Sequence, residues 1–96
     1  MPMDLHSHNY GGRTSFNDGH IHEYMGRTSV NPDTRNHIHY MEGETTFNDG
    51  HDHYYSISTG PAIYVDGGHY HNYFGYTRVA DRHIHRFGGR TSFYRD

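Results

Sequence analysis

The chain contains no cysteine, no tryptophan and no lysine. Without thiols it cannot form disulfides, thiolate zinc sites, iron–sulfur clusters or c-type haem attachments. No apolar run is long enough to cross a membrane as a helix, and no apolar signal-peptide segment is visible near the start. We therefore expect no membrane partner, and a chain that is cytoplasmic or exported without a leader.

Hydrophobic residues are also scarce, at 31% of the 96 residues. A single small domain over residues 1–96 with so thin a core needs a metal, oligomerisation or both, because disulfides are excluded. The positive charges are eight arginines spread along the chain, and the formal net charge is −3. A nucleic-acid-binding surface needs clustered positive charge, so we expect no nucleic-acid partner.

Histidine, in contrast, is abundant, and all 12 histidines lie in six His-x-His pairs. The pairs are His6/His8, His20/His22, His37/His39, His51/His53, His69/His71 and His83/His85. Their starts are 14, 17, 14, 18 and 14 residues apart, so the period is 31 to 32 residues. The chain therefore divides into three repeats, 6–36, 37–68 and 69–96, each with two pairs.

In five of the six units every second residue after the pair follows one pattern, with an aromatic residue or methionine, then glycine, then threonine, then a hydrophobic residue; the fourth unit has Ile57 and Pro61 in the second and last of these positions. The first unit reads His6, His8, Tyr10, Gly12, Thr14 and Phe16. Alternation with period two is typical of a β-strand with one buried face. We predict an all-β fold with pseudo-threefold symmetry, in which three β-hairpins form a small six-stranded antiparallel barrel or prism with inward histidines.

Turn residues separate the two units of each repeat. Asn-Asp-Gly at 17–19 and 48–50 predicts three-residue loops ending in glycine, and residues 80–82 occupy the third position without glycine. Residues 31–36 and 62–68 predict longer loops between repeats. In the first repeat this sets Phe16 opposite His20, Thr14 opposite His22, Gly12 opposite Tyr24 and Tyr10 opposite Gly26. Each aromatic ring then covers a glycine, and each threonine hydroxyl is placed to orient an imidazole.

Successive strands of such a fold run in opposite directions, so the six pairs divide between its two ends. One end gathers His6, His8, His37, His39, His69 and His71, and the other gathers His20, His22, His51, His53, His83 and His85. Six imidazoles around one axis are the donor set of an octahedral site for Fe, Co, Ni or Zn, with Cu also possible. A rival scheme pairs two motifs per tetrahedral ion and gives three Zn or Cu sites. Asp18 and Asp49 are interpreted as turn residues rather than ligands.

These patterns predict a metal-binding protein with a structural, storage or assembly role, and no catalytic residues. The alternative is a metal-rigidified module that self-assembles into an oligomer or filament, in which the apolar segment 62–65 contacts another subunit. A redox enzyme is the third reading, and it requires an open coordination position.

The segments GGRTSFNDGHIHEYMGRTS and HIHRFGGRTS resemble the YmaF family, small bacterial proteins built from repeated H-x-H…G-x-T units. The resemblance extends from His6 to Phe93 and implies a repeat protein of that family. The His-x-His strands are also similar to the needle tips of T4-type phage tail fibres, in which three chains each give a pair to an octahedral iron. That similarity implies six-imidazole chemistry, here with one chain in place of three.

Overall fold

The computed structural model describes residues 5–17 and 19–95, and within these ranges every strand pairing is antiparallel. The described residues form strands, turns and irregular segments without a helix, so the all-β prediction is confirmed. None of them forms a helix long and apolar enough to span a membrane.

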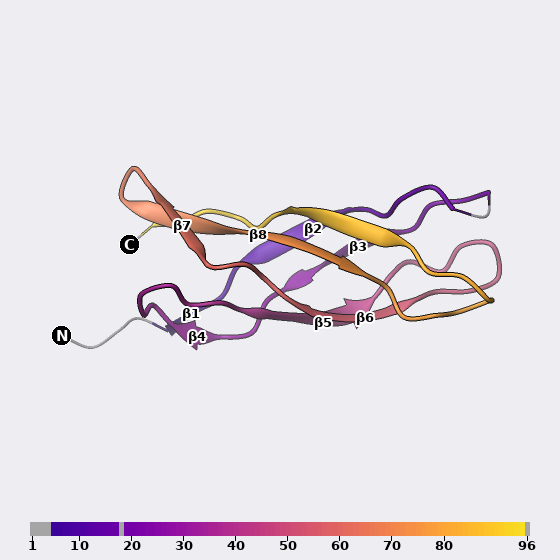
Figure 1. The fold of residues 1–96 in the computed structure, drawn as a ribbon, viewed down its shortest axis with the longest axis horizontal. Helices are drawn as coiled ribbons and strands as arrows, with labels where there is room; N and C mark the ends of the chain where they lie inside the picture. The colour runs from indigo at the N-terminus through magenta and orange to yellow at the C-terminus, as the bar shows by residue number, and fades with distance from the viewer. Residues whose placement is uncertain (1–4, 18, 96) are drawn as a thin grey trace.

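Three hairpins, one per repeat, form the body of the molecule. They pair β2 (Asn9–Arg13) with β3 (Glu23–Arg27), β5 (Tyr40–Glu44) with β6 (Tyr54–Ser58), and β8 (Gly68–Tyr76) with β9 (Arg86–Arg90). All three run along the long axis of a rod that measures 49 × 20 × 16 Å (Figure 1). We call the end with the three hairpin turns the turn end, and the opposite end the terminal end.

Four shorter strands lie at the terminal end. They are β1 (Leu5–His6), β4 (Asn31–Pro32), β7 (Ala62–Val65) and β10 (Tyr94–Arg95). Strand β1 pairs with β4, and the first part of β8 lies between β7 and β10. The prediction of a loop over 62–68 is therefore wrong. Asp66 and Gly67, with φ of 45° and 81°, form a tight turn that lets β7 pair with β8.

The predicted six-stranded barrel is also wrong, because the described strands form four small sheets rather than one closed sheet. Single backbone hydrogen bonds join the hairpins instead. At the terminal end the amides of Ser29, Gly60 and Ser92 each donate to a carbonyl of the neighbouring repeat, at 2.8 Å. The bond from Ser92 to Asn9 links the last repeat to the first, so the three hairpins form a ring without a continuous ladder.

The cross-strand register within each hairpin is the predicted one. Tyr10 lies opposite Gly26, and Gly12 lies opposite Tyr24. A Cβ atom added to Gly26 would lie 2.5 Å from the Tyr10 hydroxyl oxygen, so the tyrosine ring occupies the space over the glycine. These rings lie between the two ends of the rod, where the buried core comprises Tyr10, Tyr24, Met41, Tyr55, Tyr73 and Phe87.

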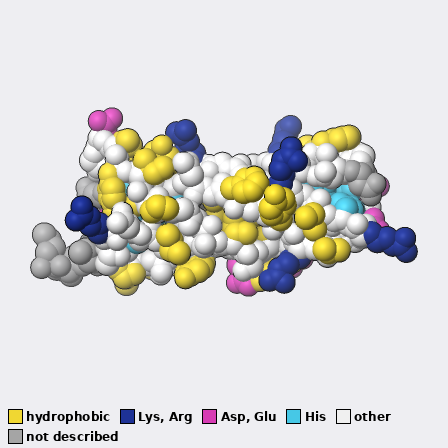
Figure 2. Space-filling model, viewed as in Figure 1, with side chains coloured by type: hydrophobic (Ala, Val, Ile, Leu, Met, Phe, Trp, Pro, Cys, Tyr) yellow, Lys and Arg dark blue, Asp and Glu magenta, His cyan; other side chains and the backbone are white. Residues whose placement is uncertain are grey.

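The hairpin turns differ from the prediction by one residue. His20 pairs with Asn17 rather than Phe16, so the loop has two central residues and not three. Asp49 and Gly50 show why, because their φ angles of 55° and 85° fit the two-residue turn that Asp-Gly favours. The extra residue bulges out of the first strand and turns Phe16 toward solvent, where it is 71% exposed. Its counterparts Phe47 and Val79 are equally exposed, and hydrophobic side chains are visible along the surface in Figure 2.

Candidate metal centres

The structure brings the 12 histidines together in two groups of six. The terminal cluster contains His6, His8, His37, His39, His69 and His71, and the turn cluster contains His20, His22, His51, His53, His83 and His85. Within each cluster one ring nitrogen per histidine lies within 4.8 Å of all the others. These are the two groups that the alternating strand direction predicts. Motifs adjacent in sequence lie in different clusters, so the rival pairing of neighbouring motifs is not what the fold presents.

In the terminal cluster the first histidine of each pair contributes to a triangle of Nε2 atoms. The Nε2–Nε2 distances are 3.1 Å from His6 to His37, 3.1 Å from His6 to His69, and 3.2 Å from His37 to His69. The second histidines form the next layer toward the core. His8, for example, lies 3.2 Å from His69, measured between Nε2 atoms. Each layer takes one histidine from each repeat.

The turn cluster repeats this arrangement. Its Nε2–Nε2 distances are 3.2 Å from His20 to His51 and from His51 to His83, and 3.3 Å from His22 to His51 and from His53 to His83. In a regular octahedron adjacent ligands are separated by √2 times the distance to the centre. Distances of 3.1–3.3 Å therefore place each nitrogen about 2.2–2.3 Å from the centre, and opposite nitrogens about 4.4–4.7 Å apart, within the observed 4.8 Å.

The backbone fixes which ring nitrogen faces the centre. The Nδ1 atom of each second histidine lies 2.8–3.0 Å from a backbone carbonyl of a neighbouring repeat. A carbonyl only accepts hydrogen bonds, so Nδ1 carries the proton and Nε2 of the neutral ring carries a lone pair. His37 Nδ1 likewise donates to the carbonyl of Thr34, at 2.7 Å.

Lone pairs therefore converge on the centre of each cluster. His37 and His71 both donate from Nδ1, and their Nε2 atoms are nevertheless only 3.1 Å apart. Two lone pairs that face each other at that distance repel, and a cation between them would relieve the repulsion. His85 gives a second sign, because its fully buried Nε2 has no hydrogen-bond partner while its Nδ1 donates to the Ser15 carbonyl. Six convergent imidazole nitrogens fit a transition metal ion.

The threonines act only partly as predicted, since the hydroxyls of Thr59 and Thr77 lie 3.3 Å from imidazole Nδ1 atoms of another hairpin. Each lies opposite the second histidine of a pair as expected, but its hydroxyl oxygen accepts from the backbone amide of that histidine, at 3.0 Å from His8 to Thr28. The Thr28 hydroxyl then donates to the Ser29 carbonyl, at 3.0 Å. That same carbonyl accepts from His39 Nδ1, at 2.9 Å. The ring is thus oriented by the carbonyl after the threonine, and the bond crosses from one hairpin to the next.

Burial favours the neutral form of the inner histidines. It lowers the pKa of His39 to about 3 and the pKa values of His71 and His85 to about 4, because a charged imidazolium would lose its hydration there. The pKa values of His8, His22 and His53 are lowered for the same first reason, with further lowering from neighbouring histidines. Neutral imidazoles are the form that binds metal.

Three carboxylates beside the clusters were not predicted from the sequence. Asp49 Oδ2 lies 3.3 Å from His20 Nδ1, Asp81 Oδ2 lies 3.6 Å from His51 Nδ1, and Asp33 Oδ1 lies 3.6 Å from His37 Nδ1. Asp49 is a turn residue, as expected, and it also faces an imidazole of another repeat. Asp18 lies outside the described residues. The sequence shows an aspartate in each of these turns, but which histidine that aspartate faces depends on how the hairpins pack against one another.

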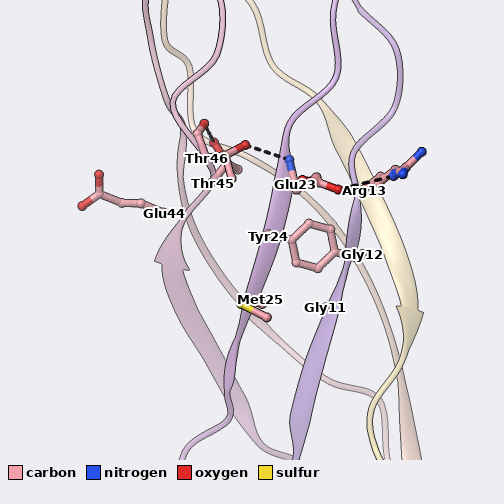
Figure 3. A pocket seen from close by; sticks show the side chains of 9 residues that line it. All are labelled: Gly11, Gly12, Arg13, Glu23, Tyr24, Met25, Glu44, Thr45 and Thr46. Carbon is pink, nitrogen blue, oxygen red and sulfur yellow. Dashed lines mark hydrogen bonds and ion pairs between the residues drawn. The ribbon is translucent and has the colours of Figure 1, made fainter.

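A separate surface groove lies between the first two hairpins and contains no histidine. It is lined by Gly11, Gly12, Arg13, Glu23, Tyr24, Met25, Glu44, Thr45 and Thr46 (Figure 3). Figure 3 also shows the join between these hairpins, where the Glu23 amide donates to the Thr46 hydroxyl at 3.0 Å. Among the residues that the structure describes, the two groups of side chains that could hold a metal ion lie at the two ends of the rod.

Fold and clusters together define a class: a histidine-rich, all-β repeat protein with two preformed six-imidazole sites. Within that class the chain belongs to the YmaF family, whose model, described as spore germination protein GerY/YamF, matches residues 1–60. No curated protein and no solved structure gives a significant match.

Proposed function

We propose that this chain binds two transition metal ions, one in each cluster, and that the ions hold its three repeats together. The convergence of six Nε2 atoms at octahedral spacing is the observation that carries this proposal. Each cluster takes two histidines from every repeat, so a single ion cross-links all three hairpins. Among the described residues the buried hydrophobic core comprises six side chains with Ile57 packed against them, and a core of this size leaves the ends of the rod dependent on such a link.

Six neutral nitrogen donors suit Fe(II), Co(II), Ni(II) or Zn(II), and Cu is a further candidate. Full occupancy by histidine leaves no coordination position for a substrate or a water molecule. A structural or storage role for the metal therefore fits the geometry better than redox catalysis, which needs an open position.

Elemental analysis of the purified protein tests this proposal. We expect two ions per chain, and a cobalt-substituted form with the weak visible absorption of six-coordinate Co(II). Removal of metal by a chelator at neutral pH is expected to abolish most of the β-sheet circular dichroism. Fewer than two ions at saturation, intense tetrahedral cobalt bands, or an unchanged spectrum after metal removal would each contradict the proposal.

The family description refers to spore germination. We propose that the chain acts in that process as a metal-binding protein. The test is complementation of a spore-forming strain that lacks its own family member. The chain is expected to restore germination, and a variant with His37 and His39 replaced by alanine is expected to fail although it is expressed at the same level. Restoration by that variant would separate the biological role from metal binding at the terminal cluster.

A metal-rigidified self-assembling module is the second candidate. Phe16, Phe47 and Val79 occupy equivalent positions in the three repeats and are 71%, 71% and 72% exposed. Exposed apolar side chains repeated around one end favour association. Sedimentation of the metal-loaded protein tests this candidate, and a monomer at every concentration would exclude it.

A further inference from the structure

The terminal cluster is covered by aromatic rings. Tyr94 stacks on His6, with ring centroids 4.4 Å apart and an interplanar angle of 27°, and it also approaches His8 and His69. Tyr64 lies over His69 from the other side, at 5.5 Å between ring centroids. These rings lie against His6 and His69, which are 4% and 0% exposed.

The backbone around the terminal cluster is also more extensively paired. His69 lies in the middle strand of a three-stranded arrangement, opposite Tyr64 of β7 and opposite Tyr94 of β10. His6 lies in β1, opposite Asn31. Withdrawing His69 from an ion therefore requires the separation of two strand pairs.

The turn cluster lacks this arrangement in the part of the chain that the structure describes. Its first histidines follow the hairpin turns directly, and the backbones of His20, His51 and His83 are each paired through an isolated bridge, to Asn17, Asn48 and Ala80 respectively. The ring neighbours of His51 are other histidines, and its side chain is 11% exposed.

A surface hollow lined by Asn17, Asp81, Arg82, His83 and Ile84 opens beside this cluster. Figure 2 shows histidine atoms at the surface of the turn end. The carboxylates of Asp49 and Asp81, 67% and 62% exposed, lie at the same end, where they attract cations and face the outer imidazoles. At the terminal cluster the corresponding carboxylate, that of Asp33, is only 15% exposed.

We propose that the two metal sites are kinetically inequivalent: the turn cluster exchanges its divalent ion with solution, and the terminal cluster retains its ion. This inference rests on the proposed binding of two ions. Opening one hairpin tip to release an outer ligand of the turn cluster breaks one isolated bridge and the exposed contacts of that imidazole, whereas the terminal ion would be enclosed by two tyrosines and paired strands. The rod then has a permanent structural ion at one end and an exchangeable ion at the other.

Release of Zn²⁺ or Ni²⁺ from the fully loaded protein to a coloured chelator in excess, followed by stopped flow, tests the inference. Two phases of equal amplitude are expected, with rate constants that differ by about tenfold or more. Replacing Tyr94 by alanine should accelerate only the slow phase. Tyr40→Ala is the matched control, because Tyr40 is also at the terminal end but is 60% exposed, and it should alter neither phase.

Variants that remove one site assign the phases. His51→Ala/His53→Ala is expected to retain only the slow phase, and His37→Ala/His39→Ala only the fast phase. If either variant fails to fold, the Tyr94→Ala comparison still decides the matter. Two ions released in one phase, or acceleration of the fast phase by Tyr94→Ala, would overturn the inference while leaving two-ion binding intact. Fewer than two ions bound before mixing would instead refute the proposed function.

Discussion

Mild acid should destabilise this fold steeply, and the size of the effect follows from the buried histidines. The pKa values of His39, His71 and His85 are lowered from 6.5 to about 3, 4 and 4, chiefly by burial. The unfolded chain therefore binds these three protons below pH 6.5, and the folded chain does not. The contribution of these neutral histidines to the free energy of unfolding is therefore complete above pH 6.5, and it decreases as the pH falls from there toward 4.

Each histidine contributes about 1.4 kcal/mol per pH unit, so at pH 5 each has lost about 2 kcal/mol and the three together about 6 kcal/mol. That sum is comparable with the whole stability of a small domain. A bound metal ion keeps protons off the same nitrogens. The unfolding free energy of the metal-loaded protein should therefore also decrease as the pH falls, at least as steeply as that of the metal-free protein.

Urea unfolding of the metal-loaded protein, followed by far-ultraviolet circular dichroism at pH 7.5, 6.0 and 5.0, measures this dependence. The midpoint should decrease at each step, with a slope that corresponds to at least three protons taken up on unfolding. A midpoint that is constant between pH 7.5 and 5.0, or that rises, would show that the clusters do not exclude protons and would refute the reasoning.

Three substitutions give further predictions. Replacing His37 and His39 by alanine should lower the metal content measured by elemental analysis from two ions per chain to one, because both residues belong to the terminal cluster; loss of both ions in a folded variant would contradict independent sites. Arg82→Gly should raise the unfolding free energy by about 0.5–1 kcal/mol in urea titrations, because Arg82 has φ of 68°, and a decrease would contradict this. Gly26→Ala should lower the melting temperature and cost about 1–3 kcal/mol, since its Cβ would lie 2.5 Å from the hydroxyl oxygen of buried Tyr10; unchanged melting would show that the ring moves freely.

The repeat pattern made the hairpins and the grouping of histidines predictable because both depend on local rules. A period of two defines the buried face, and a tight turn aligns Tyr10 with Gly26. Strand direction then alternates, and the His-x-His pairs at the starts of the strands must divide between two ends. Neither the hairpin register nor this division of the pairs depends on how separate hairpins pack.

What the sequence did not reveal depends on contacts between hairpins. Phe16 follows the period-two pattern in the sequence. The backbone amide of the preceding residue, Ser15, however, donates to the Arg86 carbonyl of another repeat. This change of partner ends the alternation and exposes Phe16. Strand β7 is a different case, because its Asp66–Gly67 turn has the same two residue types as the Asp49–Gly50 turn and is itself a sequence signal for a further hairpin.

The hydrogen bonds that orient the metal ligands are also the bonds that hold the hairpins together. The carbonyl of Ser29 accepts from His39 Nδ1, while the amide of Ser29 donates to Tyr40 in the same neighbouring repeat. Separating two hairpins therefore releases the ring of a ligand, and displacing a ligand weakens the contact between hairpins. Because each cluster draws on all three repeats, an ion bound there would link the three hairpins at that end of the rod. If the proposed function holds, metal binding at each end and the packing of the hairpins there stabilise each other, and this coupling would compensate for the small number of hydrophobic residues.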